Sequence, residues 1–108
     1  MESILQKDKT VCIICKQNAS GDHLDKHHCF GAAFRKKSEK FGLTVYIHHN
    51  KCHIFGKNAV HNNAQVNRHL QAFAQKKAMD HYKWSVDDFI KEFGRNYIYG
   101  NQDEDDTV

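Results

Sequence analysis

A Cys-x-x-Cys pair, formed by Cys12 and Cys15, limits what this chain can fold into more than any other feature. Two thiolates at this spacing in a tight turn can grip one metal ion, and they provide half of a tetrahedral site. The chain has 108 residues, of which 40% are hydrophobic. A domain with so small a core often depends on disulfides or a metal for its stability. We therefore expect one small domain in which an ion fastens the N-terminal turn to a second pair of ligands.

The segment HHNKCH supplies the second pair of ligands. His49-x-x-Cys52 repeats the spacing of the first pair, and His48 is an alternative at a slightly longer spacing. We predict a closed site of three thiolates and one imidazole, typical of structural zinc and formed by Cys12, Cys15, His49 and Cys52. Two other interpretations are a four-cysteine site that includes Cys29 and a thioredoxin-like redox pair. The second of these lacks support because the chain has no βαβ pattern around the cysteines.

The patterns of apolar residues along the chain predict an α+β fold. Strands are expected at residues 23–30 and 43–48, and the second, LTVYIH, is rich in β-branched and aromatic residues. One short helix over residues 32–42 would end at Gly42, and another would run from an N-cap at Ser85 to Gly94. A long helix from about Ala64 to His81 carries an apolar stripe at helical spacing, made of Val66, Leu70, Phe73, Ala74 and Ala78.

The domain organisation follows from the same patterns. Residues 10–100 are expected to form the folded domain, after a flexible N-terminal segment of residues 1–9. Residues 101–108 are expected to form an acidic, disordered tail. The aromatic residues before that tail are expected to belong to the core: Trp84, Phe89, Phe93 and Tyr97.

The charge of the chain favours a polyanionic partner. The formal charge is +3, but the tail holds four acids; without them 16 basic residues face 9 acidic ones, a balance of +7. A folded domain with this net positive charge is predisposed to bind nucleic acid. The N-terminus MESILQKDKT has no apolar segment of a signal peptide, and no apolar run approaches the length of a membrane span. We therefore expect a cytoplasmic protein without a membrane partner, in which a Cys-x-x-Cys pair indicates metal or redox chemistry.

Five short motifs occur in a fixed order along the chain: HHCFG, SEKFGL, CH, AVH and FGRNY. Together with the Cys-x-x-Cys pair, this order resembles the HNH, or ββα-metal, endonucleases. The resemblance is closest to small phage and prophage HNH-like proteins, and it spans about residues 10–98. It implies a zinc-stapled ββα-metal core with a short β-hairpin and C-terminal helices. It also implies the cytoplasm of a bacterial host, if a phage encodes the protein.

The resemblance assigns roles to the histidines that the zinc site leaves over. His27 would bind a catalytic divalent ion, which His53 and His61 would also hold, and His28 would be the general base that activates water. Mg, Mn, Ni or Zn can serve, although a shell rich in imidazole favours an ion other than Mg. The substrate would be DNA, cut with little sequence preference. The residues expected to contact its phosphates are Arg35, Lys36, Lys37 and Lys40.

One departure from the family pattern keeps other functions open. HNH nucleases usually carry an Asn that helps to orient the base, and here its expected place before Arg35 is taken by Phe34. Asn50 is another candidate, but its position does not match. One alternative is therefore a zinc protein of phage origin that binds nucleic acid or a host protein without cutting. Another is a structural zinc module in a larger assembly, with the aromatic residues of NYIYG as its contact surface.

Overall fold

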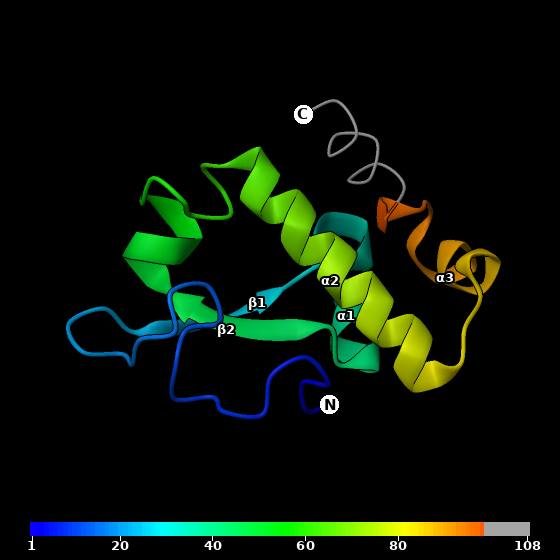
Figure 1. Ribbon diagram of the computed structural model, residues 1–108, viewed down its shortest axis with the longest axis horizontal. Coiled ribbons are helices and arrows are strands. Elements are labelled where there is room, and N and C mark those ends of the chain that lie inside the picture. Colours follow the sequence, from blue (N-terminus) through cyan, green and yellow to red (C-terminus); the bar gives the residue numbers. More distant parts are fainter. Residues whose placement is uncertain (99–108) are drawn as a thin grey trace.

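Two short strands form the only sheet among residues 1–98, which are the residues that the computed structural model describes. Strand β1 (Leu24–His28) pairs antiparallel with β2 (Thr44–His48), with Leu24 opposite His48 and His27 opposite Val45 (Figure 1). Residues that pair in this register point to the same face of the sheet. Because successive side chains of a strand alternate between its faces, Asp25 and His27 share one face with His23, which directly precedes β1, and Lys26 and His28 share the other.

The connection between the strands is a helical segment and not a tight hairpin turn. It contains a short 3-10 helix, η1 (Ala32–Phe34), and the helix α1 (Arg35–Phe41). Gly42 ends α1 with a left-handed φ of 73°, as the sequence predicted. A Cβ atom at this position would lie 2.6 Å from the backbone oxygen of Glu2. Gly42 is therefore required both by its backbone conformation and by the close approach of the N-terminal segment.

Two further helices follow η2, a π-helical turn (His49–Ile54) that begins directly after β2. Helix α2 (Ala64–Tyr82) begins where the side chain of Asn63 accepts hydrogen bonds from two backbone N–H groups. Helix α3 (Val86–Phe93) begins at Ser85, whose side chain and that of Asp88 form a capping box. In Figure 1, α2 crosses the two strands diagonally, and α3 lies at the right of the picture. The predicted positions of both helices are confirmed.

The core lies between the sheet and the helices. Phe30, Phe89 and Phe93 are buried and in mutual contact, with ring centroids 4.8–5.5 Å apart. On α2, Ala74 and Ala78 are fully buried, and their small side chains allow the helix to approach the core closely. Trp84 and Tyr97 pack against the same cluster, so the prediction that the C-terminal aromatic residues belong to the core is confirmed. The structure is a small α+β domain.

The N-terminal segment, predicted to be flexible, lies along β2. Ile4 donates a backbone hydrogen bond of 2.9 Å to Gly42, and the Gln6 side chain accepts one of 2.8 Å from the N–H of Tyr46. The predicted acidic tail lies outside the described residues. Within residues 1–98, no helix is both long and apolar enough to cross a membrane.

Candidate metal centres and the hollow beside them

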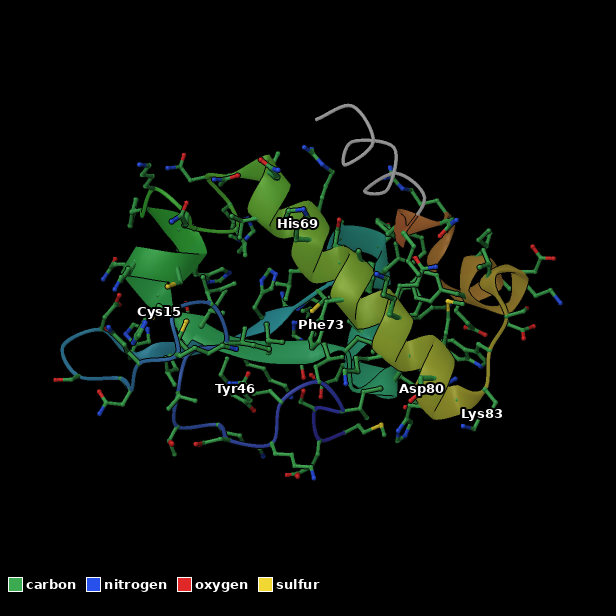
Figure 2. All side chains as sticks on the ribbon, viewed as in Figure 1. Cys15, Tyr46, His69, Phe73, Asp80 and Lys83 are labelled. Carbon is green, nitrogen blue, oxygen red and sulfur yellow. The ribbon has the colours of Figure 1, made fainter. Side chains whose placement is uncertain are left out.

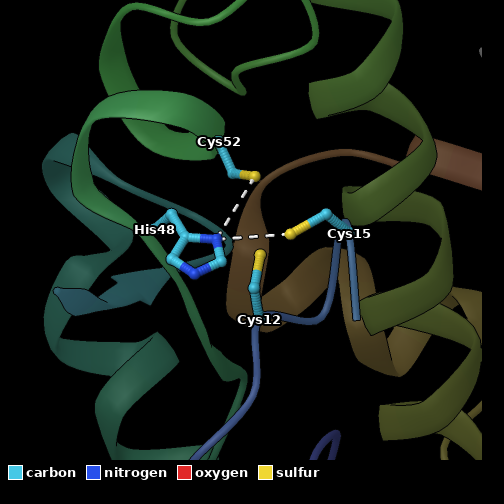
Figure 3. Close-up of side chains that lie close together, drawn as sticks. All are labelled: Cys12, Cys15, His48 and Cys52. Atoms are coloured by element: carbon cyan, nitrogen blue, oxygen red, sulfur yellow. Dashed lines mark hydrogen bonds between the residues drawn. The ribbon is translucent and has the colours of Figure 1, made fainter. Parts of the chain in front are cut away.

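The first candidate metal centre lies where the N-terminal turn meets the end of β2, next to the labelled Cys15 in Figure 2. The ligand atoms of Cys12, Cys15, His48 and Cys52 all lie within 4.8 Å of one another. Figure 3 shows the four side chains converging on one point. The N-terminal turn is closed by the N–H of Lys16, which donates to the carbonyl of Cys12 at 2.8 Å. Three thiols and one imidazole suit a tetrahedral ion, so this group can hold a metal, consistent with a structural zinc.

The imidazole of this cluster belongs to His48, and the prediction of His49 was wrong. The prediction assumed that the second ligand pair would form a turn with the spacing of the first. Residues 49–54 instead form the helical turn η2, which begins directly after His48 and brings the sulfur of Cys52 back to 3.9 Å from Nδ1 of His48. His49 points elsewhere, with its Nδ1 2.6 Å from a carboxylate oxygen of Asp25.

His48 is held in the orientation that a metal ligand needs. Its Nε2–H donates to the backbone carbonyl of Asn18 at 2.5 Å. Because a carbonyl can only accept, the proton is on Nε2 and the Nδ1 lone pair faces the thiols. Nδ1 lies 3.2 Å from the sulfur of Cys15 and 3.9 Å from that of Cys52.

The thiols of this cluster differ in how readily they ionise. Burial opposes the ionisation of Cys12, but hydrogen bonds from backbone N–H groups, including that of Ile14 at 3.3 Å, outweigh it and lower the pKa of Cys12. Burial and the nearby Cys12 sulfur raise the pKa of Cys52. The cluster thus resists holding several thiolates by itself, and a divalent cation among them would remove that resistance.

The second candidate metal centre contains the three histidines predicted to bind a catalytic ion. Ring nitrogens of His27, His53 and His61 all lie within 4.8 Å of one another. His27 comes from β1 and His53 from η2, and their ring centroids are 5.1 Å apart. The N–H of His61 donates to the carbonyl of His53 at 3.0 Å, which holds the segment between them against η2. The structure therefore brings all three predicted ligands together.

His27 has a buried nitrogen that no hydrogen bond satisfies. The residue is only 8% exposed, and its Nε2 has no hydrogen-bond partner within the described part of the chain. Burial, with His53 and His61 close by, lowers the pKa of His27 to about 3, so its ring is neutral at pH 7. A buried nitrogen left unpaired costs about 1–3 kcal/mol, and a cation bound to its lone pair would remove that cost.

His28, the predicted base, lies at the end of β1 beside this second centre. Together with His27, His53, His61 and Arg35 it lines one open hollow of about 270 Å³. Its Nε2 is 2.9 Å from Oε1 of Glu39 on α1. Hydrogen bonds from Lys26, from His28 and from the N-terminal amine lower the pKa of Glu39 to about 2. Glu39 is therefore an ionised acceptor, and the proton between the two side chains belongs to Nε2 of His28. The quoted motifs do not single out Glu39.

The predicted phosphate-contacting residues lie on one short helix, but they differ in their surroundings. Arg35 is exposed and lines the hollow, and Lys36 is exposed next to it. Lys37 forms an ion pair of 3.3 Å with Glu92 on α3. The ammonium of Lys40 lies 5.2 Å from the ring of Phe41. Of these four residues Arg35 lines the hollow, where Lys26 of β1 also lies.

Asn50 and Phe34, which stands in the expected place of the orienting Asn, have partners other than His28. Phe34 packs against the ring of Phe93 at 6.0 Å between centroids, as part of the apolar interior. Asn50 bonds to Asp22 through its backbone N–H at 3.0 Å and its side chain at 3.3 Å. The side chain that holds His28 is a carboxylate, which the motif pattern did not suggest.

Comparison of the chain with family models, with curated proteins and with solved structures gives no match. The resemblance to HNH endonucleases therefore rests on the motifs quoted above and stays a prediction. The geometry by itself shows Cys/His groups that can hold metal ions, and one of them opens onto a hollow that a basic side chain also lines.

Proposed function

We propose that the protein is a metal-dependent endonuclease of the HNH, or ββα-metal, type, which hydrolyses DNA phosphodiester bonds with little sequence preference. One observation carries the proposal: the unpaired Nε2 of His27 lies among the imidazoles of His53 and His61. The same hollow is lined by His28, and histidine is the side chain that most often serves as a general base. A cation site and a candidate base beside one opening are the two groups that phosphodiester hydrolysis needs.

The donor set fits a transition-metal ion. Three imidazole nitrogens suit Mn, Ni or Zn better than Mg, which prefers oxygen ligands. When bound, such an ion supplies a Lewis acid that polarises a phosphoryl oxygen and stabilises the charge that develops there. Burial keeps His27 neutral, and therefore able to act as a ligand, across the pH range in which the enzyme would work.

His28 would take the proton from the attacking water. Because Glu39 fixes the proton of His28 on Nε2, the lone pair lies on Nδ1. As the oxygen of water bonds to phosphorus and the bond to the leaving strand oxygen breaks, Nδ1 of His28 accepts the water proton. Glu39 is a positioning residue in this scheme, since it holds the ring and its tautomer without touching the substrate.

The remaining residues of the site would bind the DNA backbone and hold the catalytic segment in place. Arg35 in the hollow and Lys36 beside it would contact the phosphate backbone, which carries no sequence information. The centre formed by Cys12, Cys15, His48 and Cys52 would hold a structural zinc. Since Cys52 and His53 both belong to η2, which begins directly after β2, that zinc would fix the segment that delivers a ligand to the catalytic ion.

Phe34 favours a second candidate function. An HNH-type protein that lacks the orienting Asn can keep the scaffold and the basic surface while losing turnover. It would then bind nucleic acid, or a host or phage protein, through the same fold. The two functions differ in one observable, which is the cleavage of DNA.

Incubation of zinc-loaded protein with supercoiled plasmid and a panel of Mg, Mn, Ni and Zn tests the proposal. We expect nicked and linear products with at least one of the transition metals, and little product with Mg. His27→Ala and His61→Ala should abolish cleavage at limiting metal and recover part of it at excess metal. A wild-type protein that binds DNA and a second ion, yet cuts with none of the four, supports the binding protein instead.

A further inference from the structure

A third group of metal-binding side chains lies on the same face of β1 as His27. It consists of His23, Asp25 and His49, whose ligand atoms all lie within 4.8 Å of one another. The backbone places them: His49 donates its N–H to the carbonyl of His23 at 2.8 Å, which extends the strand ladder by one pair. The two rings stack with their centroids 4.8 Å apart, and Asp25 follows His23 by two residues on that face. The sequence motifs predicted His49 as a zinc ligand and indicated no role for His23 or Asp25.

We propose that His23, Asp25 and His49 bind a further divalent transition-metal ion, of the Zn²⁺, Co²⁺, Ni²⁺ or Cu²⁺ class. Two imidazoles and one carboxylate are a donor set that suits these ions. The donors are already gathered, with Nε2 of His23 3.1 Å from Oδ1 of Asp25 and Nδ1 of His49 2.6 Å from Oδ2. The side chain of His23 is 70% exposed and that of His49 35%. The ion would therefore reach the site from solvent, complete its shell with water, and bind more weakly than at the buried cysteine site.

Asp25 connects this third site to the histidine centre. Its Oδ2 also lies 2.8 Å from Nδ1 of His53. The other ring nitrogen of His53, Nε2, then faces Nε2 of His61 at a distance of 3.1 Å. A carboxylate that accepts a hydrogen bond from a ligand histidine fixes its tautomer and raises its basicity. An ion bound to Asp25 would withdraw electron density from that bond and add positive charge nearby. Each of the two ions should therefore weaken the binding of the other, and the effect must be reciprocal.

The coupling rests on the metal-binding part of the proposed function, whereas the third site stands without it. Titration of zinc-loaded protein with Co²⁺, followed by calorimetry and by the visible absorption of the bound ion, counts the sites directly. We expect wild-type protein to take up two further ions, and the His23→Ala/His49→Ala double variant to take up one. His81→Ala is the matched control, because it removes an exposed imidazole that belongs to none of the clusters in the described residues. Circular dichroism and retained zinc verify the fold of each variant.

The outcomes separate the two proposals. A double variant that binds as much Co²⁺ as wild type overturns the third site. A wild type that binds one further ion, lost in the double variant but kept in His27→Ala, supports the third site and contradicts the proposed catalytic centre. Uptake of no ion beyond zinc overturns both. Asp25→Asn should lose the third ion and weaken the remaining Co²⁺ site by about 10–100-fold, the usual effect of removing the acceptor behind a ligand histidine.

Discussion

The adjacent histidines at the end of β2 offer a matched pair of substitutions that tests the cysteine centre. His48 is 3% exposed and meets the thiols, whereas the side chain of His49 is 35% exposed and meets Asp25. We expect His48→Ala to bind zinc more weakly and to lose part of the stability of the fold, and His49→Ala to keep both. Since the substitutions are identical and the positions adjacent, any difference between them comes from what each ring contacts.

The size of the His48 effect can be worked from its contacts. Structural zinc contributes about 10–16 kcal/mol of binding free energy, so one of four ligands accounts for roughly 3 kcal/mol. Loss of the bond between His48 and the carbonyl of Asn18, 2.5 Å long, adds about 1 kcal/mol. The total of about 4 kcal/mol compares with a stability of about 5–15 kcal/mol for a typical domain. For His49, a partly buried pair with Asp25 contributes about 1 kcal/mol.

Thermal unfolding followed by circular dichroism, with zinc measured on the same samples, gives both readouts. At about 4–8 °C for each kcal/mol in a domain near this size, His48→Ala should lower the Tm by roughly 15–30 °C. His49→Ala should lower it by less than about 8 °C. Weaker zinc binding by His49→Ala than by His48→Ala would refute the assignment of the imidazole ligand.

Three further predictions concern DNA binding, catalysis and helix capping. Replacing both Arg35 and Lys36 with Ala should reduce the slope of log K against log salt by about 2, since each phosphate contact contributes about 0.9; an unchanged slope would place the DNA path elsewhere. Glu39→Gln should slow cleavage by about tenfold, the equivalent of one charge-assisted hydrogen bond to His28, and cleavage at the wild-type rate would remove its positioning role. Ser85→Ala should lower the free energy of unfolding by about 1 kcal/mol in urea titration, and no change would mean that the capping box contributes nothing.

Local sequence signals predicted most of the fold. Helix α3 is bounded by a cap at Ser85 and a left-handed Gly94, and both depend on the chemistry of single residues. The long helix was placed by its apolar spacing, and it begins at the predicted Ala64. Such features need no knowledge of distant contacts, which is why a single sequence indicates them.

The side-chain groupings were harder to predict because they depend on local geometry and on strand register. The choice between His48 and His49 depended on whether the chain after β2 forms a tight turn or a helical turn. The spacing of the ligands in the sequence is compatible with both. The group of His23, Asp25 and His49 exists because the register continues one pair past Leu24 and His48. Alternation along β1 was a usable signal, since every second position from His23 to His27 carries a metal-binding side chain.

Glu39 illustrates a different limit. It approaches His28 because α1 packs beside the end of β1, and nothing in its immediate sequence marks a glutamate in SEK as a partner for a histidine eleven positions earlier. The family pattern instead predicts an orienting group at the position of Phe34, and the side chain of Phe34 packs against the apolar core. Tertiary packing can thus place a carboxylate beside His28 although the family pattern gives the orienting role to an Asn.

The cleavage rate of His28→Ala tests the proposed endonuclease most directly. The assay compares wild type, His28→Ala and the control His81→Ala on plasmid DNA, each with its zinc retained and with the most active transition metal in excess. General-base catalysis contributes about 10²–10⁴ in rate, so His28→Ala should cut at least about a hundredfold more slowly, with unchanged DNA affinity and no rescue by more metal. His81→Ala should cut like wild type. Cleavage by His28→Ala at the wild-type rate would contradict the account, because no base would then be acting at that end of β1.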